Sequence, residues 1–340
     1  MKKFVFMFTF ALLFMVAGIM LGFRLKDPLL ATCATVAAQA ATIIKSSDIR
    51  ETPDGQTHFT SPLLECAELP ESVSDAALDS AKQSVQSAIS ASKAKGDITE
   101  ASVYFRDLNN GPWFGINEEE GYFPASLLKL PLAMSYYDRA EDDTSLLSKE
   151  ITYKPDPAVS SQLQPFGKQD ELKSGGKYSV QKLLDLMLTE SNNEAANALA
   201  VYGGSDVIND VYRDLGLTVP QPGQDYSITT HRYASFFRIL YNATYIDRIA
   251  SEKILKTLSD AAFSDGLVAG VPSGINVSHK FGSRQVNNSG TVQLHDCGII
   301  YAPKKPYILC VMTQGSDFTK LAGVIKNISS TVYSQVTSNK

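Results

Sequence analysis

Apolar and polar positions in the first part of the chain change from a helical to a strand-like spacing. Over residues 74–96 apolar side chains recur every three or four positions, which predicts a helix that stops at Gly96. Residues 101–106 and 113–116 are rich in strand-forming side chains and flank an Asn-Gly pair. This arrangement is typical of a β-hairpin.

The rest of the chain is first helical and then strand-like. Helical spacing dominates to about residue 262, with clear periods over 180–187, 195–201 and 233–241. Strand-like runs return at 275–281, 291–301 and 307–313, and a helix follows from about Asp317. We therefore expect an α/β (α+β) fold: an antiparallel sheet built from both chain ends and flanked by helices, with an all-helical insertion at about 126–262.

The N-terminus carries an apolar run of 20 residues without charge, at positions 4–23. As a helix this run would span about 30 Å, the thickness of the hydrocarbon core of a membrane. We predict a membrane anchor or signal segment over 1–26, with an uncleaved anchor favoured over a removed signal peptide. A poorly ordered linker over 27–70 and a folded domain over 71–340 complete the predicted organisation, with the domain outside the cytoplasm.

Composition narrows the classes of partner. The chain has 340 residues, 44% of them hydrophobic, and a formal charge of -5 without a long basic run. Nucleic acid is therefore not an expected partner. The four histidines are widely spread, so we expect no metal and no cofactor. We expect a monomer.

Two of the four cysteines flank a turn-like centre, Pro303-Lys304-Lys305-Pro306. Counting outward from this centre places Cys297 directly opposite Cys310. A cross-strand disulfide is geometrically possible if the hairpin is symmetric. Two buried thiols are the alternative, and the sequence leaves both open.

A hydroxyl and an amine interrupt the apolar segment 123–134, at Ser126 and Lys129. If Ser126 opens a helix, Lys129 lies one turn on and on the same face, so a nucleophile would have a base beside it. The alternative is a capping serine and a lysine that extends to solvent. Four other Ser-x-x-Lys pairs lie in polar surroundings that suit a solvated surface: Ser90/Lys93, Ser92/Lys95, Ser174/Lys177 and Ser179/Lys182.

Two further polar clusters follow along the chain. Ser191 and Asn193 stand between an apolar helix and an alanine-rich one, where a short turn could point them into a cleft. An ordinary Ser/Asn helix junction is the alternative. Lys280 and Gly282 lie on a predicted strand, where an edge lysine beside a glycine bulge is the structural alternative.

Taken in order, the clusters read Ser-x-x-Lys, Ser-x-Asn and Lys-x-Gly. From about Ser74 to the C-terminus the sequence resembles the superfamily of class A β-lactamases and penicillin-binding proteins, active-site serine enzymes. The resemblance implies Ser126 as the nucleophile, with neutral Lys129 as its base. It also implies that Ser191 passes a proton to the departing nitrogen.

The same resemblance assigns the remaining site residues. Asn193 would hold Lys129 and the substrate amide, and Lys280 would attract the substrate carboxylate. The backbone N–H groups of Ser126 and Ser283 would form the oxyanion hole, a major term in such reactions.

The chain departs from the family pattern inside two motifs. Asn192 stands where the family has aspartate, and Phe281 stands where it has threonine. Loss of the threonine hydroxyl removes a donor to the substrate carboxylate. Ser283 or Arg284, which follow Gly282, could replace it.

The largest departure is a short connection. Ser191 and Lys280 are only 89 residues apart (280 − 191), and the loop 215–225 contains no glutamate. In class A β-lactamases a loop glutamate activates the water that hydrolyses the acyl-enzyme, so the deacylating base is missing or unusual here. The weak substitutes are Asp225, Glu190, Glu194 and the pair His295/Asp296.

Three functions remain close to one another, and we favour the first. It is a β-lactamase-type hydrolase that forms an acyl-enzyme on Ser126. The second is a peptidoglycan D-alanyl-D-alanine peptidase or transpeptidase-like enzyme that acts on stem peptides. The third is a membrane-tethered, penicillin-recognising sensor that is acylated but not turned over. A degenerate binding module is disfavoured, because all three motifs keep their polar residues.

Overall fold

The computed structural model describes residues 58–61, 76–109, 111–160, 165–166, 169–204, 206–221, 225–286 and 289–338. The predicted membrane segment 4–23 and most of the predicted linker 27–70 lie outside these ranges. Within them, no helix is long and apolar enough to cross a membrane.

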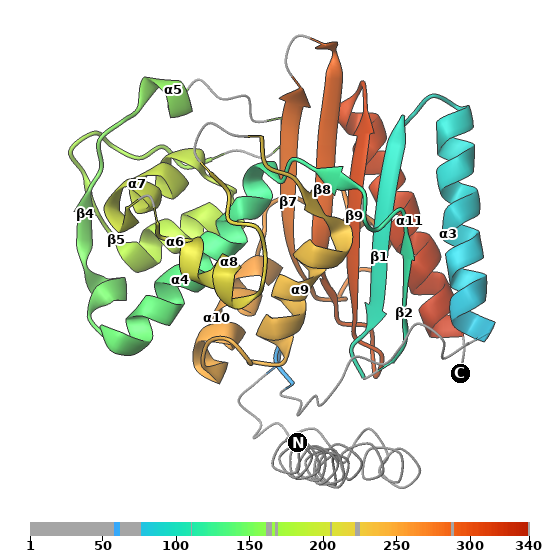
Figure 1. The fold of residues 1–340 in the computed structure, drawn as a ribbon, viewed down its shortest axis with the longest axis horizontal. Coiled ribbons are helices and arrows are strands. Elements are labelled where there is room, and N and C mark those ends of the chain that lie inside the picture. The colour runs from blue at the N-terminus through green and yellow to red at the C-terminus, as the bar shows by residue number, and fades with distance from the viewer. Residues whose placement is uncertain are drawn as a thin grey trace, which may run out of the picture. The chain divides into compact units, whose positions relative to one another are not determined.

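An antiparallel sheet forms the centre of the described domain. Five of the described strands pair in the order β2-β1-β9-β8-β7 (Figure 1). Their bounds are β1 Glu100–Asp107, β2 Trp113–Ile116, β7 Val277–Val286, β8 Thr291–Ile300 and β9 Tyr307–Gly315. The first two form the predicted hairpin, and the last three are the predicted C-terminal strands. The sheet thus combines both ends of the domain, as the sequence predicted.

Helices cover both faces of this sheet. The first and last described helices, α3 Ala76–Ala94 and α11 Phe318–Ser338, pack together on one face. Helix α9 Thr230–Tyr241 packs on the other face, against β1, β8 and β9. Because side chains of a strand alternate between faces, the sheet contributes to two separate cores. Leu294 and Leu309 belong to the core under α3 and α11, and Cys297 and Cys310 to the core on the side of α9.

The connection between the two halves of the sheet is mainly helical, as predicted. It consists of the short 3-10 helix η2 Ala125–Leu128, followed by α4 Lys129–Asp142, η3 Leu146–Ser148, α5 Pro157–Ser160, α6 Val180–Thr189, α7 Asn193–Gly203, α8 Asn209–Asp214, α9 and α10 Arg248–Ser259; η4 Val268–Gly270 precedes β7. Two small two-stranded antiparallel sheets join parts of it: β3 Gly121–Tyr122 with β6 Ile228–Thr229, and β4 Glu150–Thr152 with β5 Lys177–Ser179.

A short piece of the predicted linker is docked on the domain. Glu252 of α10 accepts hydrogen bonds from the backbone N–H groups of Phe59, at 2.9 Å, and Thr60, at 2.8 Å. The Phe59 ring packs edge-on against Tyr301, with 5.2 Å between ring centroids. Residues 58–61 are therefore fixed beside α10 and Tyr301, which follows β8.

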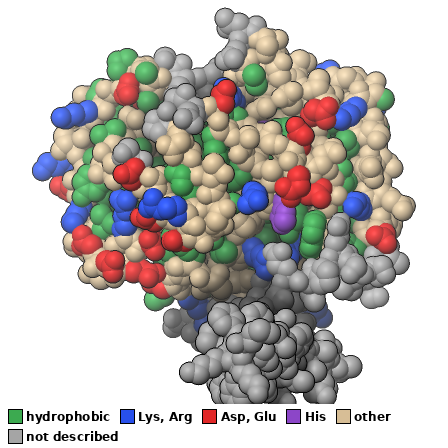
Figure 2. All heavy atoms as spheres, viewed as in Figure 1, with side chains coloured by type: hydrophobic (Ala, Val, Ile, Leu, Met, Phe, Trp, Pro, Cys, Tyr) green, Lys and Arg blue, Asp and Glu red, His purple; other side chains and the backbone are tan. Residues whose placement is uncertain are grey.

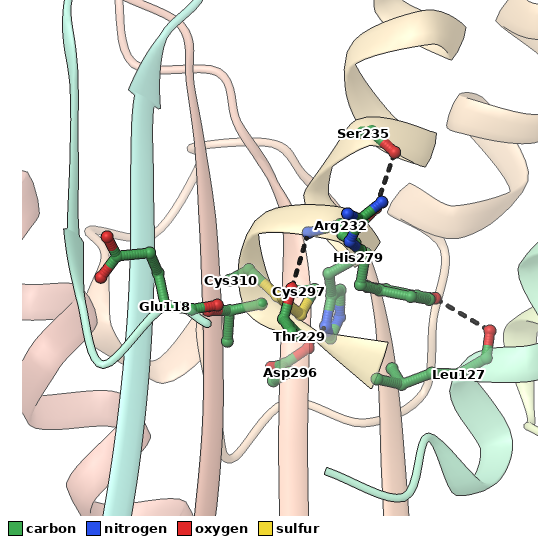
Figure 3. The surroundings of a disulfide bond; sticks show 11 residues. Glu118, Leu127, Thr229, Arg232, Ser235, His279, Asp296, Cys297 and Cys310 are labelled. Atoms are coloured by element: carbon green, nitrogen blue, oxygen red, sulfur yellow. Dashed lines mark hydrogen bonds and ion pairs between the residues drawn. A yellow bond between two sulfur atoms is a disulfide. The ribbon is translucent and has the colours of Figure 1, made fainter. Parts of the chain in front are cut away.

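The two cysteines that the sequence placed opposite each other are joined by a disulfide. Cys297 of β8 pairs with Cys310 of β9 in the sheet register, and their Cα atoms are 3.9 Å apart. Figure 3 shows the bond between these strands, close to the hydrogen-bonded side chains of His279 and Asp296. Of the two alternatives that the sequence left open, the structure has the disulfide.

Candidate active site

Ser126 lies in a short 3-10 helix that leads directly into α4, whose first residue is Lys129. The two side chains face each other, and Lys129 Nζ lies 2.9 Å from Ser126 Oγ. Ala125, just before the serine, has a φ of 49°, in the left-handed region that a non-glycine residue rarely adopts. The chain therefore makes a strained turn that presents the serine hydroxyl to its neighbour.

Ser191 and Asn193 lie at the junction of α6 and α7, as predicted. Ser191 has a φ of 54°, so this junction also makes a left-handed turn. Asn192 lies between them and caps α7, because its side chain accepts a hydrogen bond from Ala195 N. Its amide also donates to Asp170 O at 2.9 Å, which a carboxylate could not do. Because this residue is asparagine rather than aspartate, the junction of α6 and α7 is hydrogen-bonded to the loop that contains Asp170.

Lys129 is the centre of the polar network. Its Nζ lies 2.6 Å from both Ser191 O and Asn193 Oδ1, 2.9 Å from Ser126 Oγ and 3.2 Å from Ser191 Oγ. Burial, and next the charge of Lys280, hold the pKa of Lys129 well below its usual value. A neutral amine can donate to the two nearest oxygens and still offer its lone pair to the Ser126 hydroxyl.

Lys280 enters the same network from the sheet. It lies on β7, is almost completely buried, and donates from Nζ to Ser191 Oγ at 2.9 Å. Burial lowers the pKa of Lys280 to about 7, an effect that the charge of Asp296 partly offsets. The Ser191 hydroxyl therefore lies between two lysine amines, an arrangement that can pass a proton in either direction.

Gly282 lets the sheet and the Ser126 segment approach closely. A Cβ atom at this position would lie 2.7 Å from Pro124 O and 3.1 Å from Leu127 N. A real side chain there would force β7 away from the 3-10 helix. This close approach explains the glycine of the third motif better than the strand bulge that the sequence also allowed.

Substituting Gly282 with alanine is expected to lower the free energy of unfolding by about 1–3 kcal/mol, because the new methyl group overpacks this contact. Urea denaturation measures the change. Gly323→Ala is the matched control: Gly323 lies inside α11, and an added Cβ meets no atom outside its own helix turns within 4 Å. That control should gain up to about 1 kcal/mol from better helix propensity. A Gly282→Ala chain as stable as the wild type would contradict the contact.

The residues after Gly282 reach a cavity beside the serine. The cavity has a volume of about 740 Å³. The polar residues at its wall are Ser126, Lys129, Asn193, Asn197, Ser283, Arg284 and Gln285. Arg284 lies over the Phe123 ring, 3.8 Å from its centroid, which holds the guanidinium at the wall. Lys280 lies behind Ser191 and is not part of this wall, so the lysine and arginine of β7 occupy different positions around the serine.

Phe281 points away from this cavity. Its ring packs 4.4 Å from that of Phe263 and 6.2 Å from that of Phe166, in the core under α11. The departure from threonine therefore fills an aromatic cluster. The sequence offered Ser283 and Arg284 as substitute donors to the substrate carboxylate. Both residues line the cavity.

None of the carboxylates that the sequence offered as deacylating bases lines the cavity around Ser126. Asp225 is exposed to solvent and is not among the lining residues of this cavity. Glu190 accepts a hydrogen bond from Asp170 N. Asp296 is fully buried, paired with His279 at 2.7 Å and bonded to Leu267 N. Glu194 borders a second cavity of about 390 Å³, which Asn193 also borders. The lining of the main cavity also includes apolar residues, among them Val207 and Ile208 from the segment between α7 and α8.

Sequence reasoning missed Gln169, which contributes to the site. Its Nε2 donates to Ser191 O at 2.9 Å, the same carbonyl that accepts from Lys129. Gln169 lies in the loop between α5 and β5, which is rich in glycine and proline in the sequence. Only the tertiary contact reveals its role in holding Ser191.

The geometry can be compared with known proteins. The model of the β-lactamase enzyme family matches residues 81–336. The chain belongs to this family. No curated protein matches it.

Solved structures with the β-lactamase fold resemble this family member over most of the domain. A β-lactamase from Xanthomonas campestris pv. campestris is 21% identical, over 76% of this chain and 98% of that chain, with a TM-score of 0.64. A class A β-lactamase from Bacteroides cellulosilyticus is 19% identical, over 76% and 99%, with a TM-score of 0.64. PBP-A is 18% identical, over 75% and 95%, with a TM-score of 0.62. At these identities the likeness establishes the fold.

Within the described ranges, no three His, Cys, Asp or Glu side chains are close enough to hold a metal ion. On the face that Figure 2 draws, acidic and basic side chains are interspersed.

Proposed function

We propose that this β-lactamase family chain opens the amide bond of β-lactams by forming an acyl ester on Ser126. The observation that carries the proposal is the 2.9 Å contact between Ser126 Oγ and Lys129 Nζ, in a site where burial favours the neutral amine. A neutral amine beside a serine hydroxyl is the arrangement that nucleophilic catalysis requires.

The steps follow from the contacts. Lys129 accepts the proton of Ser126 Oγ as the oxygen attacks the carbonyl carbon. The oxyanion would be stabilised by the backbone N–H groups of Ser126 and Ser283, two residues that line the same cavity. The C–N bond then breaks, and the leaving nitrogen takes a proton from Ser191, whose Oγ is resupplied by Lys129 at 3.2 Å. The product of this half-reaction is an ester between Ser126 and the acyl group.

Two features support a β-lactam as substrate. Arg284 and Ser283 place a cation and a hydroxyl at the cavity wall, which suits the carboxylate of a β-lactam, and Asn193 offers an amide to its acyl side chain. A mutant of PBP-A, a protein with the same fold, has been solved as an acyl-enzyme complex with penicillin G. The remaining wall is apolar, which suits the body of such a molecule.

A second function is favoured by one observation, the lack of a carboxylate among the described residues that line the cavity. Without a base to activate water, the acyl ester would persist. That behaviour suits a D-alanyl-D-alanine peptidase that passes the acyl group of a peptidoglycan stem peptide to an amine. It also suits a penicillin-recognising sensor that remains acylated.

The proposed substrates indicate on which side of the membrane the domain would act. Peptidoglycan and entering antibiotics are met outside the cytoplasmic membrane. We therefore keep the proposal that the apolar segment 4–23 anchors the chain with its catalytic domain outside, or directs it to secretion.

The proposal is tested by mixing the chain with a chromogenic cephalosporin. Opening of the β-lactam ring is followed by the change in absorbance. The wild-type chain should open at least one equivalent, and Ser126→Ala should open none. Ser90→Ala is the matched control, because Ser90 belongs to another Ser-x-x-Lys pair, on the exposed face of α3. Ring opening by Ser126→Ala at the wild-type rate would refute the nucleophile.

Acylation should slow as the pH rises through about 7. Lys280, whose pKa burial lowers to about 7, is charged below this pH and neutral above it. Only the charged form stabilises negative charge on Ser191 Oγ while the proton moves. The pH dependence of the second-order acylation rate constant, which reports the free enzyme, measures this effect.

The variant Lys280→Arg tests whether titration of Lys280, rather than of another group, causes the fall in rate above pH 7. The guanidinium stays charged, so the variant should be slower near pH 6 but should lose the fall above pH 7. An unchanged alkaline limb in Lys280→Arg would assign that limb to another group. A fall on the acid side is expected in both chains, because protonated Lys129 cannot accept the Ser126 proton.

A further inference from the structure

The main chain is held on both sides of Ser126 by side chains that the proposed reaction does not use. On one side His295 Nε2 lies 3.1 Å from Phe123 O. On the other, the Tyr233 hydroxyl donates to Leu127 O at 2.9 Å (Figure 3 draws this bond at Leu127). The serine therefore lies within a short segment whose two ends are fixed by hydrogen bonds to its carbonyl groups.

His295 is completely buried at the centre of the sheet. It lies on β8, opposite Gly282 of β7, and its ring packs edge-on against Tyr122 with 5.3 Å between centroids. Since a carbonyl oxygen can only accept, Nε2 carries the proton. Burying an imidazole in the core costs stability, so the contact of His295 with Phe123 calls for a reason beyond packing.

The reason lies in the conformation next to the serine. Ala125 has a φ of 49°, which costs a non-glycine residue on the order of 1–3 kcal/mol and persists only when neighbours enforce it. Phe123 lies two residues before this turn, and the bond from His295 prevents its carbonyl from rotating away. Gly282 packs against Pro124 O from the same side of the sheet, so strand register and imidazole act on adjacent peptide groups.

We propose that His295 is a positioning residue that holds the strained Phe123–Ala125 turn and so aims Ser126 Oγ at Lys129. The inference rests on the proposed acylation of Ser126. It replaces the earlier hypothesis that His295 serves as the deacylating base, because the ring is buried, does not line the cavity and uses its proton on Phe123 O. Burial also lowers the pKa of His295 to about 4, so the imidazole stays neutral at physiological pH.

Two substitutions distinguish the effect of the hydrogen bond to Phe123 O from the effect of the volume of the imidazole ring. In His295→Gln the side-chain amide places an N–H close to the position of Nε2, whereas His295→Met fills a similar volume without a donor. The matched control is Ser329→Ala, which removes an equally buried hydrogen bond, from Ser329 Oγ to Leu267 O at 2.8 Å, outside the site. Each chain is titrated with a reporter penicillin, and adduct formation on Ser126 is followed by mass per folded molecule.

The maximal acylation rate should fall by about tenfold to a hundredfold in His295→Met, the loss typical of small misplacements of a reacting group. The concentration of penicillin for half-maximal rate should change little, and His295→Gln should recover most of the rate. Ser329→Ala should lose stability but keep its rate.

The outcomes are distinguishable. If wild type and His295→Met acylate at the same rate per folded molecule, the positioning role is overturned while the proposed function stands. If His295→Gln is as slow as His295→Met, the volume of the imidazole rather than its hydrogen bond matters, which also overturns the proposal. A wild-type chain that is never acylated overturns both proposals together.

Discussion

Lys129→Met lowers the acylation rate constant of Ser126 by about a thousandfold, within the range of 10²–10⁴ that a positioned general base contributes. The lysine amine lies 2.9 Å from the serine hydroxyl, and the thioether that replaces it cannot take up a proton. Lys129→Arg should be equally slow, because a guanidinium stays charged and cannot accept. Rates of adduct formation, measured by mass after rapid quenching, give both values.

The control for this pair is Lys182→Met. Lys182 also follows a serine by three residues, but it is exposed near the start of α6, whose N-cap is that serine. It should acylate at the wild-type rate. Circular dichroism shows whether each variant is folded. A folded Lys129→Arg chain that acylates as fast as the wild type would remove Lys129 from the role of base.

Release of the acyl group is expected to be at least about a hundredfold slower than its formation, because no carboxylate that could activate water is among the described residues of the cavity wall. Rapid mixing with a chromogenic cephalosporin should show a burst of about one equivalent of opened ring, followed by a slow linear phase. The burst amplitude should scale with the concentration of folded chain.

The linear phase distinguishes the two candidate functions. A slow but steady phase supports a β-lactamase whose turnover is limited by unassisted water, and a flat phase supports a peptidase or sensor. Addition of a D-amino acid as an acceptor amine should shorten the lifetime of the adduct only in the peptidase. Fast, linear hydrolysis without a burst would contradict the expectation that the apolar wall of Val207 and Ile208 leaves water without a base.

The local parts of the fold could be predicted from the sequence. The hairpin around Asn110-Gly111 depends on turn chemistry, and the opposition of Cys297 and Cys310 follows from counting along two strands from one turn. The Ser126 and Lys129 pair needs only the pitch of a helix. The three motifs could be assembled into one site because their order along the chain resembles that of a known superfamily.

Contacts between distant residues could not be predicted in the same way. His295 reaches Phe123 across 172 residues of sequence, and Gln169 reaches Ser191 from a loop without periodicity. Neither residue type marks its role, because a histidine in a strand and a glutamine in a loop have many ordinary structural uses. Their roles depend on how the helical insertion packs on the sheet, which a pattern of apolar positions does not specify.

The two motif departures show the same limit. From the sequence, Asn192 and Phe281 were substitutions that weakened the resemblance. In the structure Asn192 caps α7 and donates to Asp170 O, and Phe281 packs against Phe263. Both side chains stabilise the framework around the site, while Ser283 and Arg284 provide the polar cavity wall.

Peptide mapping of the penicillin adduct is the most direct test of the proposed chemistry. The wild-type chain is incubated with penicillin, quenched in acid, digested and analysed by mass spectrometry, beside Ser126→Ala and Ser90→Ala. We expect one acyl group per chain, located on the peptide that contains Ser126, in the wild type and in Ser90→Ala, and none in Ser126→Ala. An adduct on another residue, or no adduct in a folded wild-type chain, would contradict acyl-serine chemistry at this site.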